Sequence, residues 1–204
     1  MKQLIFIVCL GLLGCHQTEP KNATNQKTSK ATVSQDSLAF FDDLFQKNKN
    51  YVSKSFDFPV GKPNAKGYYN AQKFTENNHL GDDWNGTGGG NTDLGDPIYA
   101  IGNGYVKAAE NVGGGWGNVI RIVHKYKGNY YESLYAHCDR ISIKKGSFVT
   151  KGTQIGTIGN ADGAYYAHLH LEIRDNIFME LGGGYRTDTT GFINPTTFIN
   201  SNRN

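Results

Sequence analysis

The sequence predicts a mainly β fold built from short strands. Its 204 residues are enough for one domain with appendages. Of these residues 26 are glycine, and turn dipeptides such as Asn85-Gly86 and Gly95-Asp96 recur along the chain. Several short stretches alternate apolar and polar side chains, most clearly over residues 167–173 (AHLHLEI). We therefore expect strands joined by turns over residues 56–204, in one domain.

The first residues have the layout of a secretory signal. Lys2 precedes an apolar run that ends at Leu13, and Gly14-Cys15 follows. The run is too short for a comfortable transmembrane span. Its ending resembles the bacterial lipoprotein signal, although an ordinary signal peptide with a chance cysteine is the alternative. We expect a signal peptide over residues 1–14, a lipid on Cys15, and a location at a bacterial envelope membrane, periplasmic or on the cell surface.

The segment that follows the signal is polar. Residues 15–37 are rich in Thr, Asn, Gln, Lys and Ser, a composition that predicts a disordered tether. Residues 38–55 have Leu38, Phe41 and Phe45 at helical spacing and predict a short helical segment. This segment either packs on the domain or, as a second hypothesis, covers its groove through residues 38–51 and keeps it latent.

The charge balance excludes one class of partner. The chain has 21 Lys and Arg residues against 18 Asp and Glu, a net charge of +3. Nucleic-acid binding needs a basic stripe, which this balance does not supply. We expect no nucleic-acid partner.

The alternating stretch at residues 167–173 places two imidazoles on one face of a strand. Side chains two apart share a face, so His168, His170 and Glu172 point to one side and the apolar residues between them point into a core. A second stretch, residues 131–137, predicts a strand that ends at His137. His124 also ends a predicted strand, and we assign it no chemistry.

His79 and Asp83 lie four residues apart between runs of Gly and Asn, which favour a turn. Alone they are as compatible with a capped turn as with a metal site. Together with one histidine of the His-x-His strand, they supply two nitrogens and one carboxylate. This is the ligand set of an open catalytic zinc site with water in the fourth position, and it suits zinc better than calcium or magnesium.

Four motifs now occur in one order along the chain. They are His79-x-Gly81-x-Asp83, Gly95-Asp96-Pro97-Ile98-Tyr99-Ala100, Leu134-Tyr135-Ala136-His137 followed by the glycine-punctuated residues 146–156, and His168-Leu169-His170-Leu171-Glu172. In this order they resemble the lysostaphin/LytM-type zinc metallopeptidases, and the likeness covers residues 56–199.

The resemblance implies a two-sheet antiparallel β fold with an open groove. It implies a zinc-dependent endopeptidase that hydrolyses bacterial peptidoglycan, at cross-links or stem peptides, through a zinc-activated water. One Zn²⁺ per chain would be held by His79, Asp83 and His170, and the catalytic histidines would be His137 and His168. Which histidine performs which step stays open.

Three further residues or segments bear on this site. Glu172 is either a partner that orients a ligand imidazole or part of a strand-end salt bridge. The stretch Trp84–Leu94 is longer than in many relatives and should reshape the cleft. Cys138 stands where Leu is common in the family, and we expect a small buried side chain there.

Alternative functions follow from the same residues. A non-catalytic LytM-type module would bind the wall or activate a partner hydrolase, but such modules lose metal ligands, and this chain keeps all of them. A biotinyl or lipoyl carrier would need a single exposed Lys at a hairpin tip, which is lacking. A protease acting on proteins stays open. The expected partners are peptidoglycan peptides and, through the lipid, a membrane.

Overall fold

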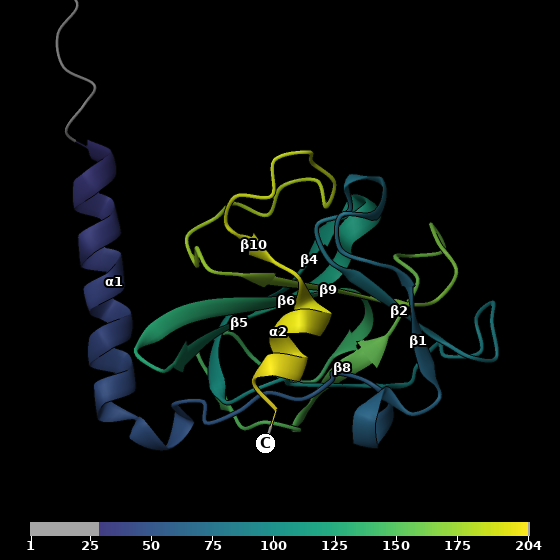
Figure 1. The fold of residues 1–204 in the computed structure, drawn as a ribbon, viewed down its shortest axis with the longest axis horizontal. Coiled ribbons are helices and arrows are strands. Elements are labelled where there is room, and N and C mark those ends of the chain that lie inside the picture. The colour runs from purple at the N-terminus through teal and green to yellow at the C-terminus, as the bar shows by residue number, and fades with distance from the viewer. Residues whose placement is uncertain (1–28, 204) are drawn as a thin grey trace, which may run out of the picture.

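The computed structural model describes residues 29–203 of the chain (Figure 1). The expected signal peptide and Cys15 lie outside these residues. In the described part, α1 spans Ser29–Lys47 and α2 spans Pro195–Ser201, and single helical turns lie at residues 49–51, 61–65, 76–78 and 114–116. The strands are β1 (Tyr68–Gln72), β2 (Asp82–Gly86), β3 (Pro97–Tyr99), β4 (Gly104–Gly113), β5 (Gly117–Tyr126), β6 (Asn129–Ile141), β7 (Phe148–Val149), β8 (Gln154–Ile158), β9 (Leu169–Arg174) and β10 (Phe192–Ile193).

The strands form an open antiparallel arrangement. Hydrogen bonds connect them in the order β1-β2-β9-β6-β5-β4-β7, with β10 beside β9 and with β8 paired to both β6 and β3. The prediction of a mainly β antiparallel fold is confirmed. The two expected sheets are continuous through β6, because its first part pairs with β9 and its last part pairs with β8.

The alternation seen in residues 167–173 positions β9 as predicted. Leu169, Leu171 and Ile173 are buried in the main hydrophobic core. The opposite side of β9 is buried as well, because the segment 177–181 lies against it and accepts hydrogen bonds from Arg121 and Arg174. The strand begins at Leu169, so His168 stands just before it.

Helix α1 begins earlier than the sequence pattern suggested. It starts at Ser29, nine residues before the expected boundary at Leu38. Residues 29–47 contain neither Gly nor Pro, so nothing in this stretch interrupts a helix once it is nucleated. Phe41 and Phe45 are buried against Val123 and Ile177, which fixes the helix beside the β5–β6 hairpin (Figure 1). Among the described helices, none is both long and apolar enough to cross a bilayer.

His124, to which no chemistry was assigned, lies fully inside the domain. Its Nδ1 donates to the carbonyl of Asn103 at 2.8 Å, and its Nε2 lies 2.7 Å from the Ser133 hydroxyl. The ring of Phe56 packs edge-on against it. Burial lowers the pKa of His124 to about 4, because a charged imidazole would lose its hydration here.

This burial predicts a loss of stability in acid. Between pH 6.5 and 4 the unfolded chain binds a proton at His124 that the folded chain does not, so the free energy of unfolding falls as the pH falls. The shift from 6.5 to about 4 corresponds to a loss of about 3 kcal/mol. Urea unfolding in EDTA, which removes metal binding, measures it. The free energy of unfolding of the wild type should exceed that of His124→Gln by a margin that shrinks by this amount from pH 7 to pH 4. A difference that does not change with pH contradicts the prediction.

Candidate active site

Two of the three residues expected to bind metal are neighbours in the sheet. β2 and β9 pair so that Asp83 lies directly opposite His170. His79 belongs to the irregular segment before β2 and forms an isolated bridge with Tyr185, while the next amide, that of Leu80, donates to the carbonyl of Gly184. His79 therefore reaches the sheet on the loop before β2, and the loop that carries Gly184 and Tyr185 holds that loop in place.

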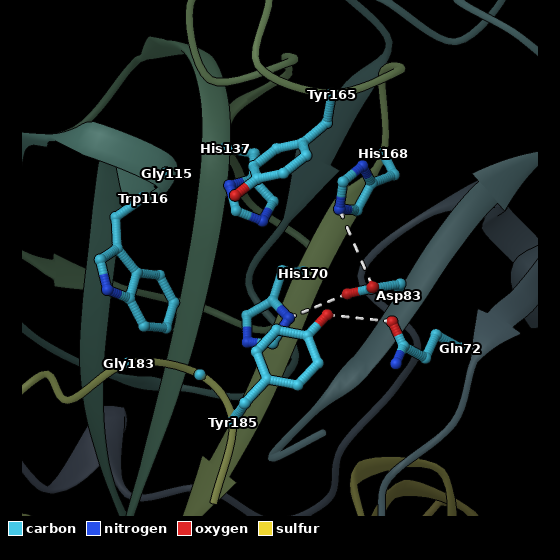
Figure 2. Close-up of a pocket in the computed structure, with 11 residues that line it drawn as sticks. Gln72, Asp83, Gly115, Trp116, His137, Tyr165, His168, His170, Gly183 and Tyr185 are labelled. Atoms are coloured by element: carbon cyan, nitrogen blue, oxygen red, sulfur yellow. Dashed lines mark hydrogen bonds and ion pairs between the residues drawn. The ribbon is translucent and has the colours of Figure 1, made fainter. Parts of the chain in front are cut away.

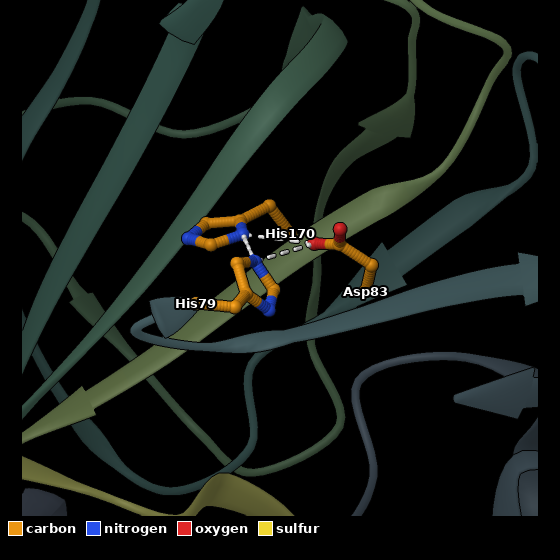
Figure 3. Close-up of side chains that lie close together, drawn as sticks. All are labelled: His79, Asp83 and His170. Atoms are coloured by element: carbon orange, nitrogen blue, oxygen red, sulfur yellow. Dashed lines mark hydrogen bonds and ion pairs between the residues drawn. The ribbon is translucent and has the colours of Figure 1, made fainter. Parts of the chain in front are cut away.

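The donor atoms of these residues converge on one point (Figure 3). Nε2 of His79 lies 2.9 Å from Nδ1 of His170 and 3.2 Å from Oδ1 of Asp83, and that oxygen is 2.8 Å from Nδ1 of His170. His79 and His170 are buried, and Asp83 is nearly so. Nδ1 of His79 is buried and has no hydrogen-bond partner among the described residues. His79, Asp83 and His170 thus form a group that could hold a metal ion.

The carboxylates of Asp83 and Glu172 make the place where the three donor atoms converge favourable for a cation. Nε2 of His170 lies 3.2 Å from Oε1 of Glu172, which turns Nδ1 of the same ring toward Asp83. Burial alone would lower the pKa of His170, but hydrogen bonds to Asp83 and Glu172 raise it to about 9. Burial alone would raise the pKa of Asp83, but the bonds from His170 and His79 hold it below its usual range.

His168 stands beside this group with a defined tautomer. Its Nδ1 lies 2.8 Å from the carbonyl oxygen of Tyr166. A carbonyl only accepts, so Nδ1 carries the hydrogen and Nε2 of the neutral ring keeps a free lone pair. Nε2 points toward the site, 3.9 Å from Oδ2 of Asp83 (Figure 2).

His137 lies within β6 rather than at its end, so the expected strand boundary was wrong. Its φ of 59° is left-handed and marks the residue at which β6 leaves β9 and joins β8. The ring centroid is 4.7 Å from that of His168. Burial, with the neighbouring His168 and His170, lowers the pKa of His137 to about 3, so its imidazole is neutral. The following residue, Cys138, is buried, as predicted.

One pocket of about 440 Å³ contains Asp83 and the three histidines His137, His168 and His170 (Figure 2). Its walls come from residues that the sequence analysis did not identify, namely Gln72, Trp116, Tyr165 and Tyr185 with the glycines at 115, 183 and 184. The Tyr185 hydroxyl donates to Oε1 of Gln72 at 3.0 Å, which closes one side. No residue of 38–51 lines this pocket. The structure therefore contradicts the hypothesis that this segment covers the groove.

Glu172 belongs to a group of charged side chains, most of them buried, that lies outside the pocket. Arg174 contacts Glu172 through Nε at 2.8 Å, and its Nη1 lies 3.7 Å from Glu132. Glu132 also binds Arg121 at 2.7 Å and Lys107 at 3.0 Å. Arg174 donates to the carbonyls of residues 180 and 181, which shortly precede the pocket-wall residues 183–185. Glu172 thus contacts His170 and also forms an ion pair with Arg174, within β9.

Comparison with known proteins shows the family of this chain. Residues 83–180 match the model of peptidase family M23. Over 80 residues the chain is 40% identical to lipoprotein NlpD of Yersinia enterocolitica, covering 39% of this chain and 78% of that protein. The chain belongs to peptidase family M23. Over 80 residues this M23 chain is also 38% identical to the peptidoglycan DD-endopeptidase ShyA of Vibrio cholerae, but spans only 18% of its length.

Solved structures share the fold of the M23 chain. The catalytic domain of the prophage-encoded M23 protein EnpA from Enterococcus faecalis superposes with a TM-score of 0.50 at 23% identity, over 70% of this chain and 97% of that one. Lysostaphin from Staphylococcus simulans gives a TM-score of 0.50 at 22% identity, over 66% of this chain and 51% of that one. At these identities the likeness concerns the fold.

Proposed function

We propose that this chain is a zinc-dependent endopeptidase that hydrolyses peptide bonds of bacterial peptidoglycan. The observation that carries the proposal is the convergence of three donor atoms, from His79, Asp83 and His170. Two of these residues, Asp83 and His170, line the pocket that also holds His137 and His168. Relatives include peptidoglycan DD-endopeptidases and proteins named murein hydrolase activators. A retained ligand set with two further imidazoles favours the enzyme.

The three donors fit a zinc ion. Two nitrogens and one carboxylate oxygen are a common protein set for catalytic zinc, and their separations of 2.8 to 3.2 Å are compatible with ligands of one ion. Glu172 fixes which nitrogen of His170 is offered. A zinc ion bound there would polarise a carbonyl and lower the pKa of its water toward about 7.

His168 and His137 supply the proton chemistry in this proposal. Nε2 of His168 is the free base of the pocket, since Nδ1 is committed to the Tyr166 carbonyl, and it accepts the proton of the attacking water. Burial lowers the pKa of His137, so its imidazole stays neutral near pH 7 and offers an N–H to the carbonyl oxygen on which negative charge develops. The closeness of the two rings lets both act on one peptide group.

The proposed location is the surface of an envelope membrane. Cys15 would carry the lipid, and residues after it would link the lipid to α1. Two relatives, from Yersinia enterocolitica and Escherichia coli, are named lipoproteins. This placement would put the pocket within reach of wall peptides.

The first test measures metal content and wall digestion together. The full chain in detergent should bind about one zinc ion and release new amino groups from purified peptidoglycan. Asp83→Ala should lose both properties. Asp188→Ala, the same change at an exposed carboxylate outside the pocket, should lose neither. Zinc binding without digestion would contradict the enzyme and favour an activator, detected by adding a purified amidase or peptidase of the same envelope.

A further inference from the structure

The groove does not end at His168. A second hollow of about 580 Å³ begins there and shares Tyr165 and His168 with the first pocket. Asn85, Asn91, Asn160 and Tyr166 line its other parts, and no carboxylate, lysine or arginine is among the lining residues. His168, the proposed base, therefore lies at the junction of two halves of one groove.

Each of the three asparagine side chains makes one hydrogen bond to the backbone. Oδ1 of Asn91 accepts from the amide of Ala167 at 2.8 Å, and Nδ2 of Asn85 donates to the carbonyl of Ala167 at 3.3 Å. Oδ1 of Asn160 accepts from the amide of Gly163 at 3.0 Å. Each carboxamide thus uses one end to bind the protein backbone.

The other ends of these carboxamides have no hydrogen-bond partner within residues 37–203, the side chains that the structure describes. Asn91 and Asn160 each leave an NH₂ donor, and Asn85 leaves a carbonyl acceptor. Secondary amides present one donor and one acceptor, so this set is complementary to them. The exposed ring of Tyr166, at 72%, adds a flat amphipathic surface beside the carboxamides.

We propose that this hollow is a substrate subsite for an uncharged, amide-bearing segment on one side of the bond that is cut. The proposal rests on the proposed function. Two sources offer this chemistry, the peptide backbone of the wall and the N-acetyl groups of its sugars. A charged side chain would be disfavoured in this subsite, because no lining group neutralises it. Asn85 and Asn91 belong to the stretch Trp84–Leu94, so this long connection sets the preference.

Isosteric changes test the subsite. Asn91→Asp and Asn160→Asp keep the oxygen that binds the backbone and replace the groove-facing donor by an anionic oxygen. We expect KM for wall fragments to rise about tenfold or more, since a hydrogen bond is lost and a carbonyl meets a charge. Tyr166→Ala should also raise KM, without adding charge. Asn111→Asp is the matched control, because Asn111 lies near the exposed end of β4, its side chain uses only Oδ1, and it lines neither hollow.

Two substrates distinguish the sources of the amide. Cross-linked wall peptides freed of sugars should show the rise in KM if the peptide backbone occupies the subsite. If only sugar-bearing fragments show it, the N-acetyl group is the occupant. Unchanged KM for both substrates in all three variants overturns the subsite while leaving the proposed function intact.

Calorimetric binding of the same fragments to the full chain separates the two proposals. The wild type could bind fragments without cutting them, and Asn91→Asp could bind them less tightly. That result would overturn the proposed function and support the subsite. A chain that neither cuts nor binds loses both. The expected result is cleavage by the wild type together with weaker binding by the variants.

Discussion

Replacing His168 by alanine is expected to lower turnover of wall peptides by a factor of about 10² to 10⁴. Nδ1 of His168 is bound to the carbonyl oxygen of Tyr166, so Nε2 of this ring keeps the lone pair that can accept a proton. Zinc content should stay unchanged, since His168 is not in the converging group of His79, Asp83 and His170.

Three measurements on His168→Ala separate a lost base from a damaged fold. Metal analysis and circular dichroism should match the wild type. The loss should appear in kcat more than in KM, and added imidazole should restore part of the rate by occupying the vacated space. A variant that retains turnover, or that loses zinc in parallel with activity, contradicts the role given to His168.

Replacing Arg174 by methionine is expected to lower the free energy of unfolding by about 3 to 5 kcal/mol. Glu172 and Glu132 are fully buried, and Arg174 contacts both. Removing it leaves Glu172 without its arginine in a place that water does not reach. The backbone carbonyls of residues 180 and 181 lose their donors at the same time.

Arg140→Met provides the matched control for this change. Arg140 is 73% exposed and its ion pair with Asp139 spans 3.5 Å, so its loss should change stability by less than about 1 kcal/mol. Urea unfolding of both variants and the wild type, with zinc removed, gives the comparison. Equal effects of the two substitutions would show that the buried group does not stabilise the fold as the contacts indicate.

The sequence predicts the parts of the site that lie on regular strands. The period-two alternation of β9 places His170 and the buried leucines correctly, because alternation is a local property of an extended chain. The same alternation continues to Arg174, but a row of charges usually faces solvent. The charged face of β9 is buried because the irregular segment 177–181 covers it, and that segment has no periodic pattern in the sequence.

Other features depend on contacts between distant segments. His137 adopts a left-handed conformation where β6 changes partners, and no turn residue in its sequence marks that change. Trp116, Tyr165 and Tyr185 reach the pocket from three different loops, and aromatic residues in loops have many uses. The run of glycines ending at Gly184 is a local signal in the sequence, because a Cβ at Gly184 would lie 3.3 Å from Trp116 in the pocket wall.

The placement of His79 on a loop has a consequence for folding. His79 and His170 are 91 positions apart, and an ion held by both, with Asp83, would tie the irregular segment to the central strands as a cross-link does. Closing a loop of about this length removes on the order of 4 to 5 kcal/mol of chain entropy from the unfolded state, by the model used for disulfides. Chelation would undo that link, and the turns that carry His79 and Tyr185 would be the first part of the domain to open, ahead of the paired strands β2 and β9.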